Sequence, residues 1–150
     1  MTEPRASKSS RTFRMECSVA IDIDAPIARV WALLSDAKRL PSWNSTITSV
    51  EGEIALGNTL ELRVPVSDRT FTPKVIELDA PRHMVWSDGF APMFRGVRSF
   101  MLNETPTGTR FEMREVFSGL MLPIIRKSLP DFGPPFEQYA RDLQRAAERE

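Results

Sequence analysis

Glu115 is the residue of this chain whose position best suits it for chemistry. The segment from Thr109 to Ser118 alternates apolar and polar residues, and the parity that holds Phe111, Met113 and Phe117 also holds Glu115. Alternation with a period of two is typical of a β-strand with one buried face. A carboxylate on that face must be hydrogen-bonded, ion-paired or protonated, because burying an unpaired charge costs free energy. Glu115 is therefore a candidate acid or base inside the protein.

Arg98, on the preceding predicted strand, is the expected partner of Glu115. If Phe100 pairs with Phe111, Arg98 and Glu115 are diagonal neighbours on the inner face. A register shifted by two residues makes them direct neighbours, whereas a shift by one residue separates them onto opposite faces. Two interpretations are open: a polar pair that orients a carbonyl or hydroxyl group of a ligand or moves a proton, or a structural ion pair near the rim of the sheet.

Three further features are candidates for a site. Tyr139, the only tyrosine, shares the apolar stripe of a predicted helix with Phe136 and Leu143, so its hydroxyl is either a donor to a ligand or a satisfied core group. Trp43 either lines a cavity or packs in the core. Residues 90–94 form an apolar loop that is a lid, a partner contact or a loop folded onto its own core.

Composition excludes several classes of site. One cysteine and one histidine are too few for zinc, haem or Rieske-type centres, so we expect no metal and no cofactor. Lys and Arg number 20, as do Asp and Glu, which differs from the basic excess of nucleic-acid binders. No apolar run reaches the roughly 20 residues of a membrane span, and residues 1–14 lack a signal core. We therefore expect a cytoplasmic monomer or homodimer without a nucleic-acid partner.

The elements that must position these residues form one predicted domain over residues 12–150, after a disordered tail over residues 1–11. Alternation and turn residues predict strands over residues 13–23, 46–53, 60–66, 71–78, 83–87, 98–102 and 109–117. Two short helices follow the first strand, and a long amphipathic helix ends the chain. Consecutive antiparallel strands with one amphipathic helix indicate an α+β fold in which the sheet buries its apolar face on that helix.

Several motifs in residues 13–148 resemble those of the START and polyketide-cyclase-like superfamily, also called SRPBCC. They are Ile21-Asp22-Ile23-Asp24-Ala25-Pro26 with Val30-Trp31, Leu34 and Trp43; Val75-Ile76-Glu77-Leu78-Asp79-Ala80-Pro81-Arg82 with Val85-Trp86; and Gly108-Thr109-Arg110 leading to Glu115-Val116-Phe117-Ser118-Gly119. The resemblance implies a helix-grip fold. In this fold a curved antiparallel sheet of about six to seven strands wraps around a long C-terminal helix, with two short helices after the first strand and an apolar cavity inside.

The same resemblance implies that a hydrophobic small molecule, such as a lipid or a polyketide, binds in this cavity. Burial of apolar surface would supply affinity, and a few polar groups would fix orientation. The expected lining residues are Trp43, Leu60, Leu62, Val64, Phe71, Phe94, Arg98, Phe100, Met113, Glu115, Phe136 and Tyr139.

Two alternatives to simple binding are open. The first is a cofactor-independent cyclase, aromatase or dehydratase in which Glu115, helped by Arg98 or Tyr139, acts as acid or base. The second is a co-chaperone-like interaction domain with a closed cavity, which would bind a partner protein through residues 90–94.

Overall fold

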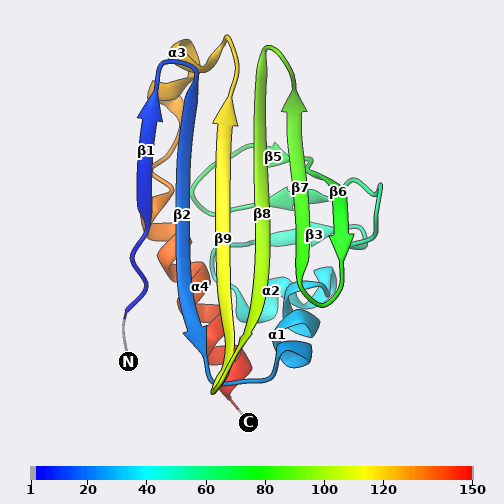
Figure 1. The fold of residues 1–150 in the computed structure, drawn as a ribbon. Coiled ribbons are helices and arrows are strands. Elements are labelled where there is room, and N and C mark those ends of the chain that lie inside the picture. The colour runs from blue at the N-terminus through cyan, green and yellow to red at the C-terminus, as the bar shows by residue number, and fades with distance from the viewer. Residues whose placement is uncertain (1–2, 150) are drawn as a thin grey trace.

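A six-stranded antiparallel sheet forms the main layer of the protein in a computed structural model that describes residues 3–149 (Figure 1). Its strands, in order across the sheet, are β1 (Ser7–Arg11), β2 (Arg14–Ile23), β9 (Gly108–Ser118), β8 (Phe94–Thr105), β7 (His83–Phe90) and β6 (Lys74–Asp79). The pairing of β2 with β9 joins strands that are far apart in the sequence, so the sheet depends on contacts of long sequence separation.

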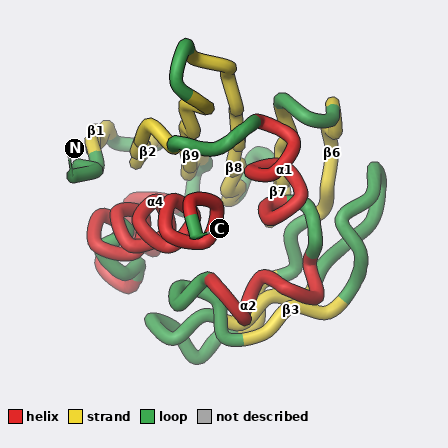
Figure 2. Tube along the Cα trace, turned by 90° about the horizontal axis from the view of Figure 1, so that it is seen from below, coloured by secondary structure: helices red, strands yellow, loops and turns green. Residues whose placement is uncertain are grey.

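Helix α4 (Gly133–Glu148) packs against the inner face of this sheet, as Figure 2 shows in a view along the strands. Its buried residues include Phe136, Tyr139, Ala140 and Leu143, whose spacing of three and four places them on one side of the helix. The short helices α1 (Ile27–Leu34) and α2 (Leu40–Trp43), separated by a 3-10 turn at Ala37–Arg39, follow β2. The predicted α+β class and the sheet that grips a C-terminal helix are confirmed.

A second, three-stranded sheet covers the part of the inner face that α4 leaves free. It consists of β3 (Ser49–Glu51), β4 (Glu61–Arg63) and β5 (Thr70–Phe71), which cross behind the main sheet in Figure 1. The predicted strand over residues 71–78 is therefore wrong as one element. It divides near Pro73 into β5 and β6, which belong to different sheets, because proline lacks the N–H that a continuous ladder needs.

The N-terminal segment differs from the predicted tail. Ser7–Arg11 forms β1, whose residues pair with β2 from Ser7 opposite Ser18 to Arg11 opposite Arg14. All five side chains of β1 are exposed, so this edge strand is held by its backbone ladder and leaves no apolar periodicity in the sequence. The expectation of disorder is wrong for this strand, and residues 1 and 2 lie outside the described part of the chain.

The β7–β8 hairpin is longer than predicted. Phe90 pairs with Phe94, so only residues 91–93 make the turn, whereas the sequence predicted strands that end at residue 87 and resume at residue 98. After β9 the chain forms α3 (Leu122–Ile125) and a 3-10 turn (Arg126–Ser128) before it enters α4.

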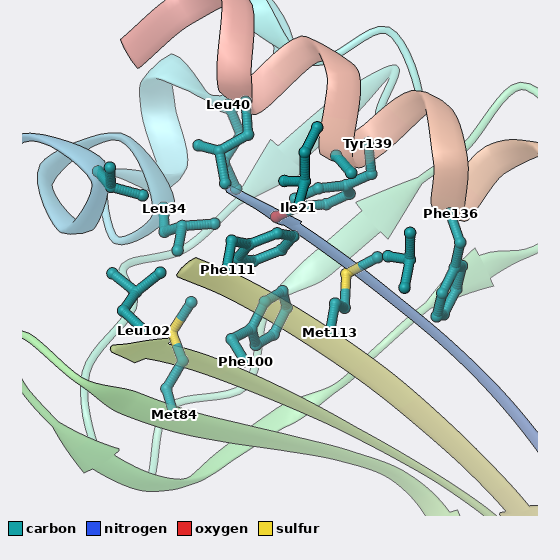
Figure 3. Close-up of a cluster of buried hydrophobic side chains, with 14 of the residues drawn as sticks. Ile21, Leu34, Leu40, Met84, Phe100, Leu102, Phe111, Met113, Phe136 and Tyr139 are labelled. Carbon is teal, nitrogen blue, oxygen red and sulfur yellow. The ribbon is translucent and has the colours of Figure 1, made fainter. Parts of the chain in front are cut away.

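The core lies between the main sheet and the helices (Figure 3). Figure 3 shows Phe100, Leu102 and Phe111 from the sheet meeting Leu34 and Leu40 from the short helices and Tyr139 from α4. These side chains have relative exposures of 2% or less, so this end of the molecule is solidly packed.

Candidate functional site

The register of β8 and β9 places Arg98 directly opposite Glu115. Phe100 pairs with Met113 rather than with Phe111, which is the two-residue shift considered from the sequence. The Nε atom of Arg98 donates a hydrogen bond to Oε1 of Glu115 at 2.6 Å. The two residues therefore form an ion pair on the inner face of the sheet.

The surroundings hold this ion pair in place. The guanidinium of Arg98 lies over the ring of Phe136, 5.0 Å from its centroid, which adds a cation–π contact from α4. Gly96, one inward position before Arg98, makes room for the carboxylate, because a Cβ there would lie 3.0 Å from Oε2 of Glu115. This second oxygen, Oε2, accepts no hydrogen bond from any residue that the structure describes. Glu115 thus keeps one oxygen for a further partner.

The ion pair lies in the wall of a cavity of about 600 Å³ between the main sheet, the second sheet and the start of α4. Nine of the twelve predicted lining residues contribute to its wall: Leu62, Val64, Phe71, Phe94, Arg98, Met113, Glu115, Phe136 and Tyr139. Most of these nine side chains are apolar, and Arg98 and Glu115 are the ion pair among them.

Three predicted lining residues lie elsewhere. Leu60 and Phe100 are fully buried in the packed core, where the ring of Phe100 contacts the ring of Trp86 at 4.9 Å between centroids. Trp43 packs edge-on against Tyr139, 6.0 Å between centroids, and is not part of the cavity wall.

A row of four aromatic rings lies beside the ion pair, and two of its members, Phe117 and Phe132, were not among the predicted lining residues. Phe94 stacks on Phe117, Phe117 on Phe132, and Phe132 meets Phe136 edge-on, with centroid distances of 5.9, 5.1 and 6.4 Å. Phe117 shares the inward parity of Glu115, so strand alternation was a signal that could have found it. Phe132 lies in the irregular segment before α4, where no periodicity indicates which way a side chain points.

The remaining wall residues come from turns and loops and from β7, β8 and α4. They are Ser45, Thr46, Ile47, Pro65, Val66, Ser67, Arg69, Pro73, Trp86, Asp88, Gly89, Gly96, Ser128, Leu129, Pro130, Pro134, Pro135, Gln138 and Arg141. Asp142 ties one of these loops to α4, since its Oδ2 accepts hydrogen bonds from the backbone N–H and the hydroxyl of Ser45 at 2.8 and 2.7 Å. Its Oδ1 accepts a hydrogen bond from Nε2 of Gln138.

Tyr139 joins the cavity to the core. Its ring stacks on Phe111 at 5.9 Å between centroids, and Figure 3 shows its hydroxyl directed into the packed side chains. The hydroxyl is fully buried and has no hydrogen-bond partner among the residues described. Burial raises the pKa of Tyr139, because the phenolate would lose its hydration. Tyr139 therefore stays protonated and contributes its ring to the wall.

Sequence comparison assigns the chain to a family. Residues 14–149 match the family described as polyketide cyclase / dehydrase and lipid transport, and the chain belongs to this family. No curated protein matches its sequence. No helix among residues 3–149 is long and apolar enough to cross a membrane.

Three solved structures illustrate the shared fold. Protein MLL2253 from Mesorhizobium loti matches with a TM-score of 0.71 and 19% identity, covering 89% of this chain and 97% of its own. A Rhodobacter sphaeroides protein matches with a TM-score of 0.67 and 20% identity, covering 95% of each chain. CalU16 from Micromonospora echinospora matches with a TM-score of 0.58 and 15% identity, covering 97% of this chain and 96% of its own. At these identities the likeness establishes the helix-grip fold.

Proposed function

We propose that the protein binds a hydrophobic small molecule, such as a lipid or a polyketide, in the 600 Å³ cavity, with a polar group of the ligand at Arg98 and Glu115. The observation that carries this proposal is the combination of an apolar wall with one ion pair inside it. Ligand pockets typically enclose about 300–1,000 Å³ and place a few polar groups among apolar ones. Membership in a family described by cyclisation, dehydration and lipid transport supports the same class of ligand.

The free polar atoms of the ion pair define what the polar end of the ligand should offer. Arg98 uses its Nε–H for Glu115, and no described residue accepts a hydrogen bond from its terminal nitrogens. A ligand carbonyl can accept from these N–H groups, and a ligand hydroxyl can donate to Oε2 of Glu115. The rest of the ligand gains affinity by burial, at about 25 cal/mol for each Å² of apolar area removed from water.

A titration with the fluorescent apolar probe 1-anilinonaphthalene-8-sulfonate tests this proposal. We expect saturable binding with enhanced emission, which long-chain fatty acids or polyketides displace. The cavity-filling variant Val64→Trp should lose most of this binding. The matched variant Val97→Trp, which adds the same ring on the outer face of β8 opposite Val116, should retain it. Equal binding by both variants would contradict a ligand site in this cavity.

A second candidate function is acid–base catalysis on the bound molecule, as in a cyclase, aromatase or dehydratase. The observation in its favour is the oxygen Oε2 of Glu115, which has no hydrogen bond within the described chain and belongs to a cavity wall residue. Glu115→Gln keeps the shape of the side chain and removes its proton-transfer capacity. Catalysis predicts that this variant retains ligand binding and loses turnover, whereas unchanged turnover would contradict it.

A further inference from the structure

Five large apolar side chains protrude together at one end of the main sheet. They are Phe13, Phe90, Met93, Leu120 and Ile124, and we call them the tip patch. Their exposed fractions run from 38% for Met93 to 74% for Ile124. Burying such side chains away from water is favourable, so an exposed cluster of them indicates a contact surface.

Backbone hydrogen bonds bring the tip patch together from three separate segments. The N–H of Gly119 donates to the carbonyl of Phe13, and the N–H of Met121 donates to that of Met93, at 3.2 and 2.9 Å. Arg126 donates from its side chain to the carbonyls of Arg11 and Thr12. The β1–β2 turn, the β7–β8 turn and α3 thus form one surface, at the top of Figure 1.

The charge around the tip patch has one sign. Residues 11–14, 89–95 and 118–128 contain four arginines and one lysine and no Asp or Glu, although the whole chain has no net charge. Arg14 is neutralised in part by Glu16 at 2.8 Å. Arg11 and Lys127 form no ion pair with any residue in the described part of the chain. The patch is therefore an apolar tip with a cationic border.

We propose that the tip patch docks onto the surface of an anionic lipid bilayer. Apolar side chains insert at the boundary between headgroups and acyl chains, while lysine and arginine attract the anionic headgroups. The proposal does not depend on what the cavity holds. It does place the bilayer beside the cavity, since Phe94, Phe117 and Leu129 line its wall and adjoin the segments of the patch.

Co-sedimentation of the full chain with lipid vesicles tests this proposal. We expect binding to vesicles of phosphatidylcholine mixed with phosphatidylglycerol, weaker binding to phosphatidylcholine alone, and a decline with added salt because the attraction of charges is screened. The double variant Arg11→Gln/Lys127→Gln should weaken binding to the mixed vesicles roughly 30-fold, from about 1 kcal/mol for each basic side chain near the surface.

Two apolar variants distinguish binding through the tip patch from nonspecific hydrophobic binding. Phe90→Ser with Ile124→Ser should reduce binding at least about tenfold, since both side chains would otherwise enter the bilayer. Met101→Ser, at an exposed position 42% accessible on the outer face of the sheet, should leave it unchanged. Circular dichroism confirms that each variant is folded. Absence of binding to anionic vesicles, equal binding by the patch variants, or a patch that captures only a partner protein would overturn the proposal.

Discussion

Arg98 and Glu115 face each other across the two strands β8 and β9, with 2.6 Å between Nε and Oε1, at the point where the packed core gives way to the cavity. On one side of the pair lie the fully buried rings of Phe100 and Phe111. On the other side Gly96 and Phe117 belong to the cavity wall. The pair thus lies between the packed core and the cavity space, and it contributes a charged position to the cavity wall.

Removing one member of this pair should destabilise the protein. Arg98→Leu leaves the Glu115 carboxylate with 11% of its side chain exposed and no cation beside it, so we expect a loss of about 3 kcal/mol in the free energy of unfolding. The double variant Arg98→Leu/Glu115→Leu should recover most of that loss, because no charge is then buried. Urea unfolding of the three proteins measures these values. Additive losses in the double variant would contradict the interpretation.

Gly96→Ala should disturb the carboxylate directly. The new Cβ would lie 3.0 Å from Oε2 of Glu115 and 3.1 Å from the ring of Phe117, so neighbours must move and we expect a cost of about 1–3 kcal/mol in the free energy of unfolding. The same substitution in a Glu115→Ala background should cost clearly less, since one of the two close contacts is gone. A double-mutant cycle by denaturant unfolding measures the difference. An identical cost in both backgrounds would place the strain elsewhere.

Glu115 illustrates how far the sequence predicts the site. Strand alternation places its side chain on the inner face of the sheet, and the apolar residues that alternate along β9 predict which side chains share that face. The register between β9 and β8 could not be predicted from the sequence, because two registers that differ by two residues both bury the phenylalanines. The structure selects one through a tight hairpin in which Thr105 pairs with Gly108, leaving two residues in the turn.

The second sheet and the segment before α4 were predicted only in part, for another reason. The strands β3 and β4 fall within the predicted strands over residues 46–53 and 60–66, but β3, β4 and β5 are only two or three residues long. Alternation therefore could not show where they end or that they form a separate sheet. Phe132 reaches the cavity from a turn rich in proline and glycine, where side-chain direction depends on the path of the backbone. Local patterns therefore predicted the long strands, α4 and some residues of the opposite cavity wall, whereas the separate second sheet and the position of Phe132 required the folded chain.

Tyr139→Phe should be neutral or stabilising by about 1 kcal/mol near pH 7, because it removes a buried hydroxyl that has no partner among the described residues. Above pH 10 the difference should grow. Since burial raises the pKa of Tyr139, the unfolded chain ionises first, and the wild-type protein loses stability as the pH rises above the usual pKa of 10. Urea midpoints of both proteins from pH 7 to pH 11 measure this effect. A destabilised Phe variant at pH 7 would indicate a hydrogen bond to the hydroxyl.

The thiol of Cys17 should react slowly with thiol reagents in the folded protein. It is 5% exposed on β2, and burial raises its pKa to about 11 from 9.0. Reaction with 5,5′-dithiobis(2-nitrobenzoic acid) at pH 8 should therefore be much slower than in urea. The raised pKa also means that stability is lost as the pH rises from about 9 to 11, and Cys17→Val should flatten this part of the profile. Rapid labelling of the native protein would contradict this assignment.

Native mass spectrometry of the protein after incubation with a total lipid extract and removal of the excess tests the central claim most directly. We predict one bound small molecule for each chain in the wild-type protein and in Val97→Trp, and none in Val64→Trp, whose added ring occupies the cavity. Only the unliganded mass in all three proteins (17.0 kDa for the wild type), or equal loading of the two tryptophan variants, would contradict a ligand-binding cavity between the sheet and α4.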